Sequence, residues 1–130
     1  MAIVSPVVSV SSGLGEIQQF TWTLSNGDTG APLGIPNNFD ATVHFYGTFG
    51  TGGSVSFYGN NNPSDFTNQT APGSGSWVIL TDPQGNAITK TATSIEAILE
   101  MPLYMGPKCT AGDGTTAIVV NLILRRKGLS

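Results

Sequence analysis

The chain of 130 residues carries one histidine and one cysteine, the side chains that most often serve as general base and thiol nucleophile. His44 lies between Val43 and Phe45, and catalysis there would require an activated serine or cysteine together with an orienting acid. The sequence contains no G-x-S-x-G motif to display a catalytic serine. We predict that the protein is not an enzyme, that His44 is a surface or interface residue, and that Cys109 is a semi-buried structural thiol.

Oxygen ligands for a cation occur in two segments, residues 60–65 and residues 112–114. Neither has the D-x-[DN]-x-[DN]-G spacing of a calcium-binding loop, so we interpret both as turns, with a bound calcium ion as the alternative. One cysteine and one histidine cannot build a cysteine-based zinc site or a centre of several histidines within one chain. The eight acidic residues are scattered singly, which is not the motif of a glycosidase with paired carboxylates. We therefore predict no metal, no cofactor and no catalytic residue.

The charge of the chain excludes one further class of protein, and the length of its apolar runs excludes another. Charged residues make up 10% of the chain, against about 25% in a typical soluble domain. Lys and Arg together number five, and three of them are consecutive, at Arg125, Arg126 and Lys127. The chain therefore cannot build the basic face that a nucleic-acid binder needs. No apolar run approaches the roughly 18 residues of a membrane span, and we expect no secretory signal because the first residues lack its basic and apolar regions.

Alternation of polar and apolar residues is the main structural signal along the chain. Residues 40–50 and 54–58 alternate on either side of a glycine-rich loop, which predicts a hairpin. Residues 17–24 alternate as well, and residues 115–124 form the longest apolar run, typical of a central strand that is covered on both faces or by a neighbouring subunit. With 17 glycines and 8 prolines as turn formers, these signals predict one domain over residues 1–130, an all-β antiparallel β-sandwich.

One short helix is predicted near residues 93–100. Thr93 and Glu96 have the spacing of a capping box. Apolar residues then recur at helical spacing, at Ile95, Ile98 and Leu99. Pro102 would end the helix, because proline disfavours the helical conformation in the residue before it. Residues 59–75, by contrast, contain three consecutive asparagines and no sustained periodicity, so we predict a loop there.

The order of several short segments between residues 80 and 126 is more specific than any one of them. A turn-rich stretch, an apolar stretch with the predicted helix, a glycine-rich turn, an apolar strand and a basic pair follow one another, at residues 80–87, 95–104, 111–115, 115–124 and 125–126. This order resembles small structural proteins of tailed bacteriophages, the capsid decoration or cement proteins. The resemblance extends more loosely to residues 26–30 and 43–59, and the chain departs from the pattern at residues 60–76 and in its first fifteen residues.

The resemblance implies a jelly-roll-like β-sandwich attached to the outside of an icosahedral head. A protein of this family binds the major capsid protein and stabilises contacts between capsomers, so we expect the protein on the outer surface of the virion. A cement protein binds the assembled shell and not its separated subunits, and mass action then stabilises the shell. The low charge of the chain suits this role independently, because interface cores are depleted in Lys, Glu and Asp.

The alternative function is that of a carbohydrate-binding β-sandwich module of a phage tail or fibre. A platform that stacks on sugar rings could use the aromatic residues Trp22, Trp77, Tyr46, Tyr58 and Tyr104. Aromatic residues in alternating strands more often belong to the core or to a subunit interface, so this alternative ranks second.

Self-association is expected because the predicted strands carry few charges. Exposed sheet edges are normally protected by Lys or by inward-pointing charge, and residues 42–49, 54–58 and 115–124 contain no charged residue. We predict a homo-oligomer, with a dimer favoured and a trimer next. Residues 1–15 are interpreted either as an arm that reaches a neighbour or as an edge strand. The candidate contacts with the capsid or with other subunits are Ile3, Val4, Val7, Val8, Arg125, Arg126 and Lys127.

Overall fold

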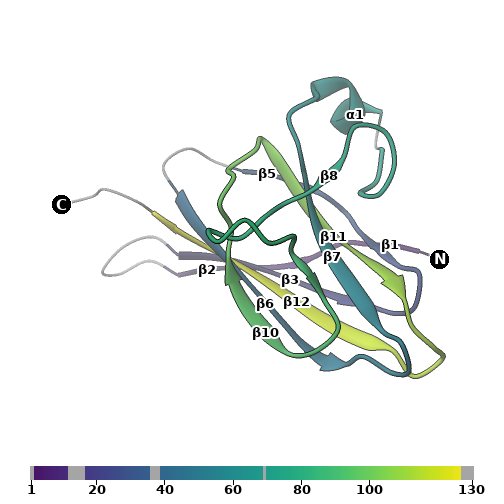
Figure 1. The fold of residues 1–130 in the computed structure, drawn as a ribbon. Coiled ribbons are helices and arrows are strands. Elements are labelled where there is room, and N and C mark those ends of the chain that lie inside the picture. Colours follow the sequence, from purple (N-terminus) through teal and green to yellow (C-terminus); the bar gives the residue numbers. More distant parts are fainter. Residues whose placement is uncertain (1, 12–16, 36–38, 69, 127–130) are drawn as a thin grey trace.

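Two β-sheets pack face to face in the computed structural model, which describes residues 2–11, 17–35, 39–68 and 70–126 (Figure 1). The elements in chain order are β1 (Ile3–Val4), β2 (Val7–Ser11), β3 (Ile17–Leu24), β4 (Thr29–Gly30), β5 (Leu33–Gly34), β6 (Phe39–Thr48), β7 (Ser54–Asn60), α1 (Pro63–Thr67), β8 (Val78–Ile79), β9 (Thr89–Lys90), β10 (Ser94–Ala97), β11 (Tyr104–Ala111) and β12 (Ala117–Arg126). The seven-stranded sheet A has the order β1-β4-β11-β7-β8, with β5 beside β11 and β9 beside β7. The five-stranded sheet B has the order β10-β6-β12-β3-β2.

The strand order within the two sheets identifies the architecture as a jelly roll. If β4 and β5 count as one strand, and β8 and β9 as another, the chain from β3 to β12 contains eight strands. Sheet B then holds the first, eighth, third and sixth of these, and sheet A holds the second, seventh, fourth and fifth. Early and late strands therefore lie side by side in both sheets, as two Greek keys require. The predicted all-β, jelly-roll-like sandwich is confirmed.

The longest apolar run of the sequence forms β12, at the centre of sheet B. This strand pairs antiparallel with β6 on one side and with β3 on the other. Its side chains alternate between the two faces of the sheet. Those that face sheet A are fully buried, namely Ile118, Val120, Leu122 and Leu124. Those on the opposite face, Val119, Asn121 and Ile123, are only half-buried, so this central strand contributes both to the core and to an outer surface.

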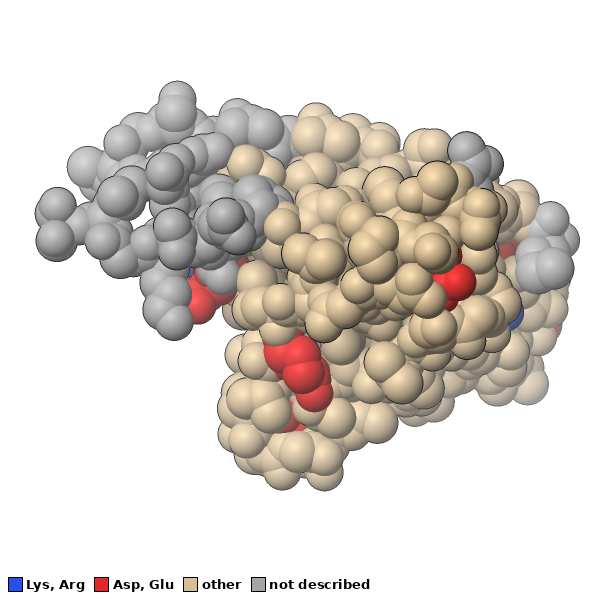
Figure 2. All heavy atoms as spheres, turned by 90° about the horizontal axis from the view of Figure 1, so that it is seen from above, with Lys and Arg blue, Asp and Glu red and all other residues tan. Residues whose placement is uncertain are grey.

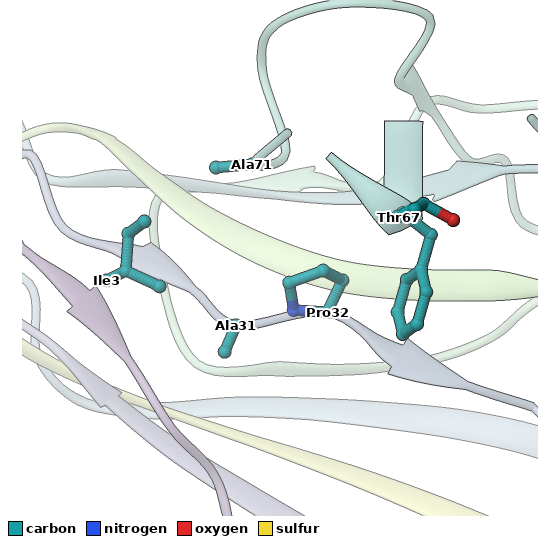
Figure 3. Close-up of a pocket in the computed structure, with 6 residues that line it drawn as sticks. Ile3, Ala31, Pro32, Thr67 and Ala71 are labelled. Atoms are coloured by element: carbon teal, nitrogen blue, oxygen red, sulfur yellow. The ribbon is translucent and has the colours of Figure 1, made fainter. Parts of the chain in front are cut away.

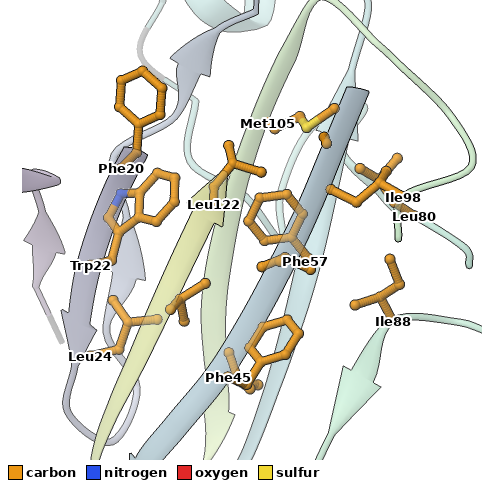
Figure 4. Packing of buried hydrophobic residues seen from close by; sticks show 14 of the residues in the cluster. Phe20, Trp22, Leu24, Phe45, Phe57, Leu80, Ile88, Ile98, Met105 and Leu122 are labelled. Carbon is orange, nitrogen blue, oxygen red and sulfur yellow. The ribbon is translucent and has the colours of Figure 1, made fainter. Parts of the chain in front are cut away.

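Aromatic side chains join the two sheets across the core (Figure 4). Trp22 of β3, Phe45 of β6 and Phe57 of β7 are fully buried. The rings of Trp22 and Phe57 meet edge to face, with centroids 6.2 Å apart and planes inclined by 68°, a favourable geometry for two aromatic rings. The indole N–H of Trp22 donates a hydrogen bond of 3.1 Å to the carbonyl oxygen of Ala31. The polar atom of this large core residue is thereby satisfied.

A glycine is required where β4 approaches this tryptophan. A Cβ atom on Gly30 would lie 2.5 Å from Cδ of Pro107 and 2.8 Å from Cδ1 of Trp22. Both distances are shorter than van der Waals contact. The absence of a side chain at this position lets sheet A pack directly on the indole.

The predicted helix near residues 93–100 is wrong. Residues 94–97 form β10, which pairs antiparallel with β6 at the edge of sheet B. Glu96 makes an ion pair of 2.6 Å with Lys90 instead of capping Thr93. Two turns of helix are only marginally stable in isolation, whereas the strand satisfies the backbone groups of β6 that would otherwise be unpaired. Tertiary pairing therefore overrides the local helical pattern.

The helix in the described part of the chain is α1, inside the segment that was predicted to be a loop. Asn62 precedes it, and its side chain accepts a hydrogen bond of 3.0 Å from the amide of Ser64. Pro63 occupies the first turn, where its missing N–H and fixed φ are tolerated. An N-cap asparagine followed by proline is a helix-start signal, so the sequence did contain the information that located this short helix.

Replacement of a core residue of β12 should destabilise the protein far more than replacement of an exposed one. Leu122→Ala should lower the free energy of unfolding by about 2–5 kcal/mol, because it leaves a cavity between the sheets. Leu103→Ala should change it by no more than about 0.5 kcal/mol, since Leu103 is 50% exposed. Urea denaturation of both variants measures the difference. Equal effects would contradict the assignment of the inner face.

Candidate functional site

The outer face of sheet A is covered by the chain itself. The segment between β7 and β8 crosses it, and the ring of Phe66 in α1 stacks on Tyr104 of β11 with centroids 4.1 Å apart and planes inclined by 10°. A Cβ atom on Gly106 would lie 3.0 Å from Cγ of Pro72, and Ser56 of β7 is only 2% exposed. The segment therefore covers the part of this face that β7 and β11 form.

Asp65 is the residue that holds this covering segment together. Its carboxylate accepts a hydrogen bond of 2.9 Å from the side chain of Asn60 and one of 2.8 Å from the amide of Ser76. The indole of Trp77 donates to the carbonyl of Thr70 over 2.9 Å, and the amide of Thr70 donates to the carbonyl of Asp65. The hydrogen bonds from Asn60 and then Ser76 lower the pKa of the Asp65 carboxyl below its ordinary value.

The outer face of sheet B, in contrast, is open. Register places Val7, Thr21, Asn121, His44 and Ile95 side by side across its five strands. The flanking rows include Gln19, Ile123, Thr42 and Ala97 on one side and Thr23, Val119 and Tyr46 on the other. None of these side chains is charged and none is buried. We call these three rows the open face.

A polar network centred on Asn121 lies in the middle of the open face. The amide oxygen of Asn121 accepts hydrogen bonds from the hydroxyl of Thr21 and from the side chain of Gln19, the latter of 3.4 Å. Its amide nitrogen donates to the hydroxyl of Tyr46 over 2.8 Å. The ring of Tyr46 in turn lies against His44, with centroids 4.7 Å apart. These contacts orient a few polar groups on a half-apolar surface that carries no charge, as in the core of a protein–protein interface.

The residues with catalytic potential are not brought together into a reactive centre. His44 lies half-buried on the open face, where its ring contacts that of Tyr46 with the planes inclined by 42°, in agreement with its interpretation as a surface or interface residue. Cys109 is fully buried rather than semi-buried, and its thiol donates to the carbonyl of Ala111 over 3.3 Å. Among the described residues, no three side chains of His, Cys, Asp or Glu gather into a metal site. In the same part of the chain, no helix is both long and apolar enough to cross a membrane.

The segment with Asp113 behaves as a turn. Its carboxylate accepts hydrogen bonds of 2.8 Å from the amide of Thr51 and of 2.6 Å from the hydroxyl of Thr115. Hydrogen bonds from Thr115 and then Thr51 hold the pKa of the Asp113 carboxyl well below its ordinary value. The carboxylate therefore links the loop after β6 to the loop before β12. In this structure residues 112–114 form a turn that these hydrogen bonds stabilise.

The predicted contact residues at the N-terminus form edge strands of the same chain. β1 pairs with β4 in sheet A and β2 pairs with β3 in sheet B, so residues 3–4 and 7–11 lie at sheet edges. Ile3, Val7 and Val8 are 62%, 72% and 57% exposed. Val4 is half-buried and packs against the core.

The basic contact candidates lie at the other end of the chain. Arg125 is exposed in β12, and its register partners are Ile17 and Asp40 on the neighbouring strands. Arg126 pairs with Phe39 through the backbone of β12, whereas its side chain and Lys127 lie outside the described residues. All seven candidate contacts stay predictions.

Both tryptophans are buried and therefore cannot stack on a sugar ring. Trp22 is fully buried and Trp77 is 7% exposed, and both indole N–H groups are hydrogen-bonded within the chain. Tyr104 is covered by Phe66. Tyr46 is the aromatic candidate that lies on the open face.

An apolar groove of about 520 Å³ separates β1 from α1 (Figure 3). Its walls carry no charged side chain and are formed by Ile3, Ala31, Pro32, Phe66, Thr67 and Ala71. Figure 2, the view from above, shows a few separate acidic side chains among mostly uncharged described residues. Among the described residues that line it, Thr67 contributes a hydroxyl and the others contribute apolar surface.

Sequence reasoning missed the open face as a unit. The signals present in the sequence were the uncharged strands and the half-polar outer positions of β12. These residues form one surface only because of the register between strands that are distant in the sequence. Asn121, for example, is hydrogen-bonded to Tyr46 and Gln19, which lie 75 and 102 residues away.

Comparison with known proteins finds only distant structural similarity. No family model matches the chain, and no curated protein matches it in sequence. A cupin domain from Bordetella pertussis Tohama I is similar with a TM-score of 0.40 and 13% identity, over 97% of this chain and 98% of that one. A carbohydrate-binding module of Cellvibrio mixtus lichenase 5A, solved with cellotriose, is similar with a TM-score of 0.31 and 16% identity, over 95% of this chain and 88% of that one. At these values neither likeness bears on function.

Acid should weaken the fold through Asp65. A carboxyl whose pKa is lower in the folded than in the unfolded chain stabilises the fold above the unfolded value, and this contribution is lost as the pH falls through the folded value. The free energy of unfolding should therefore decrease between about pH 5 and about pH 2. Asp65→Asn should reduce stability at neutral pH and make this decrease smaller, with Asp113 responsible for part of what remains. Denaturation at several pH values tests this, and an identical acid profile in the variant would contradict it.

Proposed function

We propose that the protein is a structural protein of a tailed bacteriophage, a capsid decoration protein that binds the outside of the head and stabilises contacts between capsomers. The observation that carries the proposal is the open face of sheet B, an uncharged surface that surrounds an oriented polar network. The order of segments between residues 80 and 126 favours this family, although β10 occupies the place where that order was expected to contain a helix.

The difference between the two outer faces supports a role in docking. The face of sheet A is occupied by α1 and its loops, whereas the rows around Asn121 lie half-exposed in the isolated chain. Charged residues are depleted at the centre of protein–protein interfaces, and the open face has none in its three rows. A charged or glycosylated surface would serve a free monomer better, because net charge keeps proteins soluble.

The dimensions of the sheet fit an interface of ordinary size. Strands of these lengths, spaced by about 4.8 Å and rising by about 3.4 Å per residue, cover on the order of 600 Å² in projection. A standard interface takes about 800 Å² from each partner. Sheet B therefore supplies most of such a contact, and Arg125 at its end offers a guanidinium that can pair with a carboxylate of the major capsid protein.

A carbohydrate-binding module is the second candidate, and the surface that favours it is the same. Tyr46 presents an aromatic ring beside the amide of Asn121, and the amide of Gln19 lies on the other side of Asn121, which is a chemistry suited to sugar hydroxyls and ring faces. The burial of both tryptophans weighs against it, since stacking on sugars would then rest on one half-buried tyrosine.

The purified protein should bind heads that lack it, and a charge on the open face should weaken that binding. Val119→Lys introduces an ammonium group that must lose its water in the contact, and we expect the affinity to fall at least about tenfold, equivalent to about 1.4 kcal/mol. Val78→Lys is the matched control, because Val78 is 63% exposed and lies in β8 at the edge of sheet A. Co-sedimentation with the heads measures both affinities.

Failure of the unmodified protein to bind such heads, together with a clear signal on a glycan array, would reverse the order of the two candidates. Equal binding by Val119→Lys, Val78→Lys and the unmodified chain would contradict the open face as the contact. We also expect the gene of the major capsid protein to lie beside the gene of this protein.

A further inference from the structure

The two edges of sheet B are built differently. At the β10 edge, Glu96 forms an ion pair of 2.6 Å with Lys90 of β9, and both side chains are 22% exposed. This ion pair connects the edge of sheet B to sheet A and places charged groups on that edge. Covering an edge and charging it are two ways in which proteins prevent a further strand from adding to it. At the opposite edge, β2 is the last strand of sheet B, and residues 2–11 contain no charged residue.

The β2 edge also exposes apolar side chains on both of its faces. Val7 is paired with Thr21 and so lies on the side of the open face, whereas Val8 is paired with Phe20 on the side of the core. Their exposed fractions are 72% and 57%. β-branched residues favour extended strands, and no described strand lies beyond β2 to cover them. The unpaired backbone groups of an edge without charge are a template for another strand.

We propose that β2 pairs antiparallel with β2 of a second copy of the chain, so that two sheets of five strands become one continuous sheet of ten about a two-fold axis. This inference goes beyond shell binding and does not require it. The backbone groups on the outer edge of each β2 then find partners, and the side chains of Val7 and Val8 gain cross-strand neighbours from the other copy.

A second copy fits this edge because the edge is complementary to itself. Antiparallel pairing of a strand with its own copy is symmetric, which gives a closed dimer with no edge left over at the contact. Any register of Val7–Ser11 against itself sets uncharged residues opposite one another, so no like charges meet despite the net charge of −3. The pairing also extends the open face across both copies without covering it.

The expected dimer is weak because the contact is narrow. A five-residue strand edge buries much less than the roughly 1,600 Å² of a standard interface. We therefore expect a monomer at nanomolar concentration and a dimer at micromolar concentration or above, with a mass that rises on concentration from 13.5 kDa toward twice that value.

Sedimentation velocity over a dilution series tests the proposal with paired variants. Val8→Lys should remain monomeric where the unmodified chain is dimeric, because it places one ammonium group from each copy in the narrow contact, and Lys on an edge strand opposes pairing. Ile95→Lys is the matched control, since Ile95 is 63% exposed on the β10 edge, and it should dimerise like the unmodified chain. Val7→Lys is the second variant, in case Val8→Lys does not fold, and circular dichroism checks the fold of all three.

Several outcomes would overturn the proposal. A monomer at every concentration, a trimer, or dimerisation that Ile95→Lys abolishes and Val8→Lys leaves intact each contradict pairing through β2. Amide hydrogen exchange supplies a second readout, because the amides of β2 should become protected only in the dimer. Binding to heads is measured separately. A monomeric variant that still binds heads would overturn neither the proposed function nor its test. A chain that forms the dimer but does not bind heads would contradict the proposed function and support the β2 contact.

Discussion

Pairing of β12 with both β6 and β3 is the interaction on which the rest of the structure depends. The strand takes part in two hydrogen-bonded ladders over nearly its whole length, and its inward side chains lie at the centre of the core. Its outward side chains include Asn121, the centre of the polar network on the open face. One ten-residue strand therefore determines how the sandwich packs and what it presents to a partner.

The unequal treatment of the two outer faces follows from the connections of the jelly roll. The long connection from β7 to β8 carries α1 over sheet A, where Asp65 and Trp77 fix it through hydrogen bonds. The described connections of sheet B leave its outer rows half-exposed. With 10% charged residues in the whole chain, such a face is poorly suited to solvent and well suited to permanent contact with another surface. This asymmetry is the physical basis of the proposed function.

The strands were predictable from the sequence because successive side chains in a β-strand point to opposite faces of the sheet. A half-buried strand therefore has alternating apolar and polar residues. The helix was placed wrongly because Ile95 and Ile98 satisfy a helical spacing, although residues 94–97 gain more from pairing with β6. The true helix start at Asn62 and Pro63 was hidden in a stretch whose composition favours turns. Local signals thus compete, and long-range pairing decides between them.

The candidate surface could be predicted only in part. Lack of charge in residues 42–49 and 115–124 is visible in the sequence, but the contacts of Asn121 with Thr21 and Tyr46 arise from strands 100 and 75 residues apart. No local rule supplies that register. The burial of Trp22 and Trp77 could not be predicted from the sequence either. An aromatic residue in an alternating strand has the same local pattern whether the core or a ligand covers it.

Hydroxyl-radical footprinting of the protein, free and bound to heads, tests most directly whether the open face is the surface that the shell covers. Tyr46, His44 and Ile123 should react in the free protein and become protected on the shell, while the exposed pair Val78 and Ile79 of β8 should react equally in both states. Protection of Val78 and Ile79, with Tyr46 and His44 unchanged, would contradict the account.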